Sequence, residues 1–273
     1  MSPLRLPLLL LPLLALGCPE KDDTGTPLPE GDTDADADTD TDTDTDTDAD
    51  GDTDADSDAD SDADTDADSD LPLDGFGAIT GDCGVLDEAV IEGAAPLMFL
   101  NDLDFGQLAF DYEQLSEGGQ KVYDDGNLGG SSLYSEIFSY EVLYRCELAA
   151  LLKTEGEILY EDAGGKKTDL LVELADLKIG VSVTRAYHYP PSEPYTVQMA
   201  TDLLEQKLGD ILLSSENVTD EDAWARQVLH VMAYEPEHAD CLRTAWEVLP
   251  ASLQADTVVM VTVTSGADEF VYH

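Results

Sequence analysis

The stretch from Asp169 to Arg185 reads DLLVELADLKIGVSVTR and decides the fold class. Two runs rich in Val, Ile and Leu, Asp169–Leu174 and Ile179–Arg185, predict β-strands. Ala175-Asp176-Leu177 lies between them as a turn, and a connection this short makes the two strands antiparallel neighbours. A third β-like run, Glu157–Glu161, precedes them, so we expect a three-stranded meander.

Apolar periodicity on either side of the meander predicts three helices and two further strands. The expected helices are Leu133–Lys153, Tyr195–Leu213 and Pro236–Leu249, and the expected strands are Gln227–Tyr234 and Thr257–Thr264. A helix between two parallel strands requires a right-handed crossover, and helices then cover both faces of the sheet. The predicted fold class is therefore an α/β sandwich with a mixed sheet, in the order helix, three-strand meander, helix, strand, helix, strand.

The residues before the first of these helices carry weaker signals. Leu97–Leu100 and Leu108–Phe110 are short apolar groups, and the polar residues and glycine between them predict strands and turns. The run from Asp124 to Ser132 predicts a loop that enters a helix capped by Ser131 or Ser132, and it lacks the Lys-Ser/Thr pair of a phosphate-binding loop. We therefore divide the chain into a signal peptide (1–17), a tether (18–70), an N-terminal extension (71–130) and an α/β core (131–273).

Charge divides the chain as sharply as hydrophobicity does. Every even-numbered residue from 32 to 70 is Asp, twenty in all, and no hydrophobic core can form in such a run. Residues 71–273 hold 37 acidic and 10 basic residues, so this part alone carries a net charge of −27, against −49 for the whole chain. A field of this sign repels polyanions, whereas nucleic-acid binders are usually basic. The composition argues against a nucleic-acid partner.

The first 17 residues have the form of an export signal, with one positive charge at Arg5 followed by a leucine-rich run that two prolines interrupt. The run is too short for a membrane-spanning helix. Residues 14–18 read Leu-Ala-Leu-Gly-Cys and resemble the bacterial lipobox, with the large and small residues before Gly17 exchanged. The resemblance implies that Cys18 is lipidated and that the chain is a cell-envelope lipoprotein, anchored in the outer membrane, with the membrane as its partner.

Residues 18–70 predict an extended, disordered, Asp-rich tether, because charge repulsion opposes collapse. Asp46, Asp48 and Asp50, followed by a glycine, match the start of a calcium loop of the EF-hand type, in which alternating carboxylates converge on one ion. Position twelve of that loop would be Ser57 rather than Glu, and no apolar helices flank it. We expect diffuse, weak calcium binding rather than a specific site.

The order of the elements from Ser131 to Thr264 resembles the PD-(D/E)xK nuclease superfamily. In that superfamily an Asp opens the second strand, an acid and a lysine two residues apart lie on the third strand, and the first helix often adds a Glu. Asp169 stands at the start of the corresponding strand, and Glu141, or in second place Glu136, is the candidate from the helix. The resemblance implies metal-dependent phosphodiester cleavage, with Mg²⁺ or Mn²⁺ held in part by Asp169.

The third strand departs from that pattern. A period of two places Ser182 where the superfamily has its acid and Thr184 where it has its lysine, with Arg185 on the opposite face. Asp169 and one helical glutamate are then too few to hold a metal ion for cleavage. A binding or scaffolding domain is therefore our first expectation. The alternative is an enzyme, a metal-dependent hydrolase with a rearranged site around Asp169, Ser182, Thr184 and Arg185.

Three cysteines follow Cys18, and their pairing is open. A bridge between Cys83 and Cys146 is one possibility, and an odd number of cysteines in an exported chain leaves at least one thiol unpaired. His238 and Cys241 lie three residues apart on an expected helix, which could place two metal ligands on one face. No second pair is visible, so a surface histidine beside a buried cysteine is the favoured interpretation.

Two further histidines are candidate functional residues. His230 lies within an expected strand and is predicted to be a hydrogen-bonded core residue rather than a ligand. His188 lies just past Arg185. It would therefore stand near the mouth of the expected cleft, and we keep it as a candidate site residue.

Overall fold

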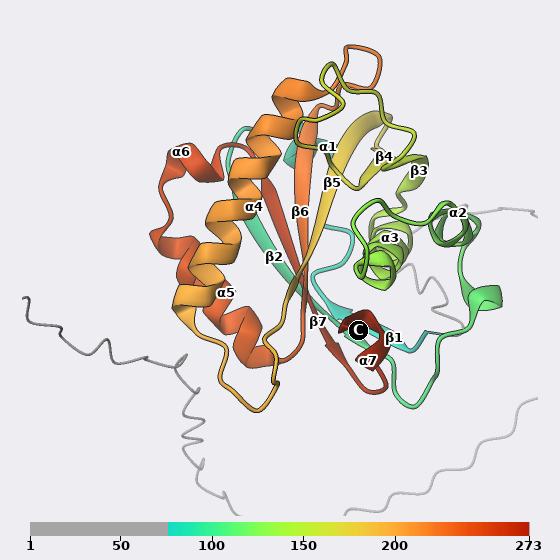
Figure 1. The fold of residues 1–273 in the computed structure, drawn as a ribbon, viewed down its shortest axis with the longest axis vertical. Helices are drawn as coiled ribbons and strands as arrows, with labels where there is room; N and C mark the ends of the chain where they lie inside the picture. The colour runs from blue at the N-terminus through green and yellow to red at the C-terminus, as the bar shows by residue number, and fades with distance from the viewer. Residues whose placement is uncertain (1–75, 273) are drawn as a thin grey trace, which may run out of the picture. The chain divides into compact units, whose positions relative to one another are not determined.

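A seven-stranded mixed sheet with helices on both faces organises residues 76–272, the part of the chain that the computed structural model describes (Figure 1). The strands are β1 (Ala78–Gly81), β2 (Leu97–Asp104), β3 (Ala150–Thr154), β4 (Leu170–Leu174), β5 (Leu177–Ala186), β6 (Arg226–Ala233) and β7 (Val258–Ser265). The helices are α1 (Glu88–Glu92), α2 (Glu117–Asp125), α3 (Leu133–Glu147), α4 (Val197–Asn217), α5 (Pro236–Val248), α6 (Ala251–Gln254) and α7 (Glu269–Tyr272). The predicted fold class, with its order of helix, meander, helix, strand, helix and strand, is confirmed.

The strands follow the order β1-β2-β7-β6-β5-β4-β3 across the sheet. The four central strands β2, β7, β6 and β5 are parallel. At one edge β1 pairs antiparallel with β2, and at the other edge β4 pairs antiparallel with β5 and β3 antiparallel with β4. Helices α4 and α5 connect the parallel strands β5, β6 and β7 and pack against each other. Because these strands are parallel, their carboxyl ends meet at one edge of the sheet, where α/β proteins commonly bind ligands.

Two hydrophobic clusters lie on the opposite faces of the sheet. Strand β6 contributes to both, because alternate side chains point to opposite faces. The cluster beneath α3 includes Phe138, Val181, Val228, Met232 and Met260. The cluster beneath α4 and α5 includes Leu204, Leu208, Leu229, Val231 and Val261. Burial on both faces explains why the central strands are continuous apolar runs.

The first strand of the meander is not where the sequence suggested. We expected a helix to Lys153 and a strand over Glu157–Glu161, but α3 ends at Glu147 and β3 covers Ala150–Thr154. Leu148 closes the helix in the left-handed region, with φ of 58°. Leu148 and Leu151 continue the helical spacing of apolar residues, so periodicity alone extended the predicted helix too far. The segment 157–161 is instead part of the connection between β3 and β4.

The N-terminal extension holds a strand that the sequence analysis divided. Strand β2 runs unbroken through Asn101 and Asp102, and residues 108–110 form no strand. Asn101 is buried because its side chain joins a polar chain in the core, described below. Strand β2 pairs with β7 over its full length, so the extension completes the same sheet as the remainder of the domain.

The remaining elements agree with their predicted positions to within a few residues at each end. The turn between β4 and β5 is confirmed at Ala175 and Asp176, whose φ values of 49° and 63° are those of a tight hairpin turn with two left-handed residues. Cys18, which we expect to be lipidated, the predicted aspartate tether and the calcium candidates Asp46, Asp48 and Asp50 lie outside the described residues.

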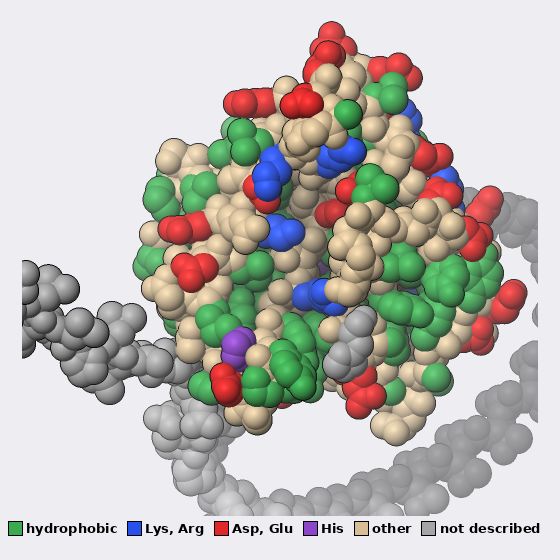
Figure 2. Space-filling model, viewed as in Figure 1, with side chains coloured by type: hydrophobic (Ala, Val, Ile, Leu, Met, Phe, Trp, Pro, Cys, Tyr) green, Lys and Arg blue, Asp and Glu red, His purple; other side chains and the backbone are tan. Residues whose placement is uncertain are grey.

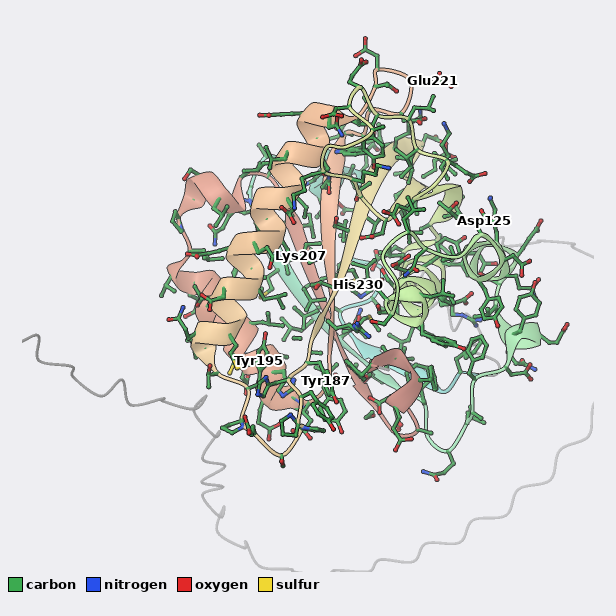
Figure 3. The ribbon with its side chains drawn as sticks, in the orientation of Figure 1. Asp125, Tyr187, Tyr195, Lys207, Glu221 and His230 are labelled. Atoms are coloured by element: carbon green, nitrogen blue, oxygen red, sulfur yellow. A yellow bond between two sulfur atoms is a disulfide. The ribbon has the colours of Figure 1, made fainter. Side chains whose placement is uncertain are left out.

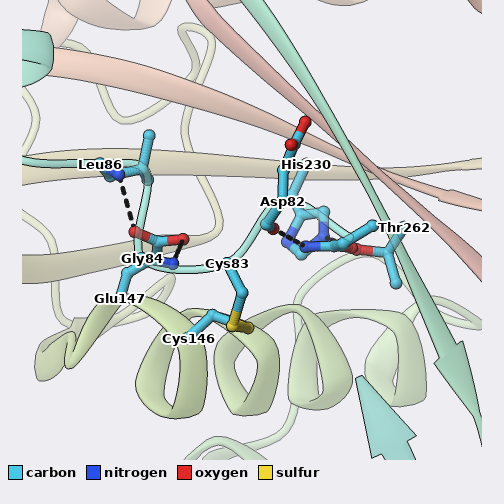
Figure 4. Close-up of a disulfide and its surroundings, with 9 residues drawn as sticks. Asp82, Cys83, Gly84, Leu86, Cys146, Glu147, His230 and Thr262 are labelled. Carbon is cyan, nitrogen blue, oxygen red and sulfur yellow. Dashed lines mark hydrogen bonds between the residues drawn. A yellow bond between two sulfur atoms is a disulfide. The ribbon is translucent and has the colours of Figure 1, made fainter. Parts of the chain in front are cut away.

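A disulfide between Cys83 and Cys146 joins the segment after β1 to the last turn of α3, which confirms this proposed pairing (Figure 4). Next to it, the buried carboxylate of Glu147 accepts hydrogen bonds from the backbone N–H groups of Gly84 at 3.0 Å and Leu86 at 2.7 Å. Burial raises the pKa of Glu147, and these backbone donors oppose the shift. The covalent and hydrogen-bonded links together fix the N-terminal segment on α3.

Candidate functional site

Asp169 stands immediately before β4 and is tied to β5 by two hydrogen bonds. Its backbone N–H donates to Val181 O at 3.0 Å, and its Oδ2 accepts from the backbone N–H of Val183 at 2.6 Å. The buried neighbour Thr168 places its Oγ1 3.3 Å from the hydroxyl of Ser182. The structure therefore brings Asp169 and Ser182 together across two neighbouring strands, as the sequence pattern indicated.

The carboxyl group of Asp169 is electrostatically strained. The residue keeps some accessible surface, but protein atoms surround the carboxyl group, and this burial is the main reason that its pKa is raised to about 7. The negative charge of Glu136 adds to the rise, and Glu155 contributes less. The Val183 N–H and the positive charge of Lys207 act in the opposite direction. Coupled, perturbed carboxyl groups of this kind are typical of functional sites but also occur in structural networks.

Glu136 and Glu141 of α3 have different surroundings. Glu136, 3% exposed, accepts hydrogen bonds from Ser132 Oγ at 2.8 Å and Asn127 Nδ2 at 3.0 Å, and burial raises its pKa. Glu141, 2% exposed, accepts from Ser116 Oγ at 2.7 Å and pairs with Arg145 Nε at 2.9 Å. Glu136, the second candidate, is therefore the glutamate near Asp169. The placement of Glu141 in the site was wrong, because its carboxylate anchors α2 to α3.

Lys207 of α4 is the residue that the sequence analysis missed. Its charge acts on both Asp169 and Glu136, yet it forms no hydrogen bond or ion pair within the described part of the chain. Figure 3 shows Lys207 on the side of α4 near the sheet, and Figure 2 shows Lys and Arg side chains gathered along a hollow beside this helix. The sequence feature that could have revealed Lys207 is its position between Leu204 and Leu208, where a charged residue lies beside the buried face of the helix.

The third strand confirms the predicted alternation of faces. Val181 and Val183 pack in the cluster beneath α3, so Ser182 and Thr184 project to the other face. Arg185 returns to the α3 side, where its guanidinium donates to Ser131 O at 3.2 Å and Val271 O at 3.3 Å. Arg185 therefore holds the start of α3 and the C-terminal segment together. It does not join Asp169.

The side chains around Asp169 do not fit a catalytic metal ion. Within residues 76–272, no group of three or more His, Cys, Asp and Glu side chains is arranged to hold a metal. One oxygen of Asp169 already accepts a backbone hydrogen bond, and Glu136 is engaged by Ser132 and Asn127. Cleavage assisted by magnesium needs more free carboxylate oxygens than these. We therefore derive no chemical step through Mg²⁺ or Mn²⁺.

His230 is confirmed as a hydrogen-bonded core residue, with an exposed fraction of 0% (Figure 3). Its Nδ1 lies 2.8 Å from Ser139 Oγ and its Nε2 lies 2.7 Å from Thr262 Oγ1. Since Thr262 donates to Asn101 Oδ1 at 2.6 Å, its oxygen must accept from His230 Nε2–H, and Ser139 then donates to Nδ1. The chain is complete with a neutral imidazole, and burial lowers the pKa of His230 to about 3.

The other candidate histidines lie beyond the carboxyl end of β5. His188 is partly exposed and lies 3.2 Å from Glu193 Oε2 in the loop before α4. His238 was expected on the surface but is only 7% exposed, and its Nδ1 lies 2.8 Å from Ala186 O. Cys241 is fully buried in the cluster beneath α4 and α5. No described group of three ligands includes either residue of the proposed His238–Cys241 metal pair.

Two surface cavities lie at the opposite end of α4 from these histidines. One of about 370 Å³ is lined by Gly165, Lys166, Leu213 and Asn217 among others. A second of about 190 Å³ is lined by Ile211, Trp224, Arg226, Gln227 and Asp256 among others. Asp169, Ser182 and Arg185 line neither of them. The nuclease-like residues therefore do not converge on one of these cavities.

No protein-family model matches the chain, and no solved structure matches it. A Dictyostelium discoideum protein described as "AAC-rich mRNA clone AAC4 protein" is 37% identical over 160 residues, which is 56% of this chain. The match covers only 23% of that protein, so the chain spans about a quarter of its length. Within the described residues, no helix is both long and apolar enough to cross a membrane.

Proposed function

We propose that the chain is a lipid-anchored protein of the bacterial cell envelope, whose acidic α/β domain is a binding or scaffolding module. The lipid on Cys18 attaches it to the outer membrane, and the aspartate tether holds the domain away from the surface. The domain keeps the element order of the PD-(D/E)xK nucleases without their chemistry. The membrane and a protein or other envelope component are its partners.

The observation that carries the non-catalytic function is the environment of the nuclease-like residues. Asp169 is bonded to Val183, Glu141 is paired with Arg145, and Arg185 is bonded to backbone carbonyl groups. Each of these charged groups stabilises a contact between elements of the fold. Ser182 and Thr184, in the positions of the nuclease acid and lysine, supply neither the carboxylate that would bind the metal ion nor the positive charge of the lysine.

The disulfide supports the proposed location, because stable disulfides belong mainly to oxidising compartments outside the cytoplasm. The similarity to a Dictyostelium discoideum protein is an argument against a bacterial source. Membrane fractionation tests whether the chain is anchored by a lipid on Cys18. Cys18→Ser should move the protein from the membrane to the soluble fraction and abolish lipid labelling, because the acyl chains supply the anchoring energy. Unchanged membrane association of the variant would contradict the anchor.

A cleavage assay tests the non-catalytic function. The purified full chain should leave single-stranded and duplex DNA intact with Mg²⁺ or Mn²⁺, and Asp169→Ala should behave identically. Cleavage that persists through purification and disappears in Asp169→Ala would overturn the proposal.

One observation favours a second candidate, an enzyme with a rearranged site. In the nucleases a lysine from the third strand lies near the metal-binding carboxylates. Here Lys207 of α4 supplies a positive charge that acts on Asp169 and Glu136. If the cleavage assay is positive, Lys207→Met should abolish the activity. Lys166→Met is the matched control, since Lys166 forms an ion pair with Asp210 of α4.

A further inference from the structure

A row of aromatic rings lies at the carboxyl ends of the parallel strands β5, β6 and β7, away from Asp169. Tyr187 follows β5, Tyr234 follows β6, and Tyr272 is in α7 beyond β7. Their ring centroids are 5.1 to 5.2 Å apart in all three pairs. His238 extends the row, with its ring 5.9 Å from Tyr234 and 4.5 Å from the ring of Tyr195. Figure 3 shows Tyr187 and Tyr195 at this end of the sheet, where Figure 2 shows hydrophobic side chains at the surface.

His238 has a free nitrogen at this place. Its Nδ1 lies 2.8 Å from Ala186 O, which can only accept, so Nδ1 carries a proton, and Nε2 is the nitrogen that presents a lone pair in the corresponding neutral tautomer. Nε2 forms no hydrogen bond within residues 76–272, although the residue is more than nine-tenths buried. Protein atoms do not enclose this nitrogen completely, so solvent reaches it. The site thus holds a fixed hydrogen-bond acceptor without a donor.

The surrounding charges are negative. Asp268, Glu235 and Glu269 all act on the phenol of the half-buried Tyr234, and with burial, the largest cause, they raise its pKa. Arg185, whose charge acts on Tyr272, is already bonded to Ser131 and Val271. Aromatic faces, carboxylates and a ring nitrogen that accepts a hydrogen bond are the groups that recognise a cation carrying N–H donors.

We propose that Tyr234, His238 and the flanking carboxylates form a binding site for a primary ammonium group. One N–H of the ligand donates to His238 Nε2, and the charge lies against the tyrosine faces. The ammonium belongs either to a free polyamine or to a lysine side chain of a protein. The site uses no residue of the Asp169 cluster, so the inference is independent of the proposed function.

The test is a titration of the ¹⁵N-labelled full chain, observed through the imidazole nitrogen signals of His238 at constant ionic strength. Cadaverine represents the free amine and N-acetyl-lysine methylamide the protein side chain, and the tighter of the two identifies the source. Tetramethylammonium, which lacks N–H donors, and glucose, which lacks charge, are the controls. Either ammonium ligand should shift the Nε2 signal in a saturable way, whereas both controls should leave it in place. An unmoved Nε2 signal, or equal shifts from either control, would overturn the proposal.

Variants separate this site from general attraction to an acidic protein. Tyr234→Leu should weaken ammonium binding about two- to fivefold, in line with an exposed cation–π contact. Tyr189→Leu is the matched control, because Tyr189 is 75% exposed on the adjacent loop and should not matter. Should Tyr234→Leu fail to fold by circular dichroism, Tyr234→Trp tests the same point and should keep the affinity. Equal losses in Tyr234→Leu and Tyr189→Leu, or loss of binding in a folded Tyr234→Trp, would contradict the site.

Discussion

The polar chain around His230 and the carboxyl cluster around Asp169 lie in the same domain and are organised in opposite ways. In the first, Ser139, His230, Thr262 and Asn101 satisfy one another and the imidazole is neutral. In the second, two carboxyl groups repel each other beside a lysine that forms no ion pair with a described residue. Buried polar groups are tolerated when every partner is present. Full pairing indicates a structural role for His230. Incomplete pairing makes Asp169 the residue whose substitution tells more about function.

The largest expected effect follows from breaking the His230 chain. His230→Leu removes the partners of Ser139 Oγ and Thr262 Oγ1 inside the core and should lower the free energy of unfolding by about 2 to 5 kcal/mol. Urea denaturation at neutral pH measures it. The control His188→Ala alters a partly exposed histidine and should change stability by less than about 0.5 kcal/mol. A loss below 1 kcal/mol in His230→Leu would mean that the hydrogen-bonded side chains around His230 do not stabilise the fold.

The two regions should also respond oppositely to pH. The pKa of Asp169 is raised to about 7, so its contribution to stability is present below its unfolded pKa near 4 and is lost as pH rises through 7. The pKa of His230 is lowered to about 3, so its contribution is present above its unfolded pKa near 6.5 and is lost as pH falls toward 3. Between about pH 4 and 6.5 the two slopes oppose each other.

Asp169→Asn isolates the first of these slopes. The amide cannot ionise and can still accept from Val183 N–H, so the variant should gain stability over the parent from pH 4 to 7, by up to a few kcal/mol. Asp169→Ala removes the acceptor as well and should lose about 1 to 3 kcal/mol at pH 4. Denaturation at a series of pH values measures both. A constant difference between Asp169→Asn and the parent across this range would contradict a raised pKa.

The smallest expected effect comes from Glu136, whose charge is the second cause of the Asp169 shift. Glu136→Gln keeps an acceptor for Ser132 and removes the charge, so the pKa of Asp169 should fall, by about a unit or less because burial persists. Glu141→Gln is the control, since Glu141 is paired with Arg145 and does not act on Asp169. Titration of the Asp169 carboxyl carbon by NMR measures both variants. An equal change in the two would argue against the Glu136–Asp169 coupling.

The sequence predicted the elements that local hydrophobicity marks. Helix α4 was placed within a few residues because its apolar positions repeat with the helical period, and strand β6 because it is a short run that is buried on both faces. Strand β2 was divided because Asn101 looked like a turn residue, whereas its burial depends on Thr262, 161 residues away. Strand β3 was absorbed into a helix because nothing local marks Leu148 as a left-handed residue.

The candidate site was predicted in part for the same reason. Asp169 and Ser182 follow from pairing between adjacent strands, which a short turn fixes. Glu141 and Glu136 both lie on α3, and the sequence did not show which of them approaches Asp169. Their hydrogen-bond partners, which depend on tertiary packing, distinguish them: Glu141 is bound by Ser116 and Arg145. Glu136 is bound by Ser132 and Asn127. Lys207 comes from a crossover helix, whose rotation against the sheet is set by tertiary packing. Local patterns do not encode contacts of this kind.

The most direct measurement is the titration of the Asp169 carboxyl carbon by NMR in the full chain, with and without millimolar Mg²⁺. We predict an apparent pKa near 7 that Mg²⁺ leaves unchanged, because one carboxylate oxygen is already bonded to Val183 and no third ligand among the described residues completes a metal site. A fall of a unit or more that depends on Mg²⁺ concentration would show a metal ion bound at Asp169. That result would contradict the account and favour the hydrolase.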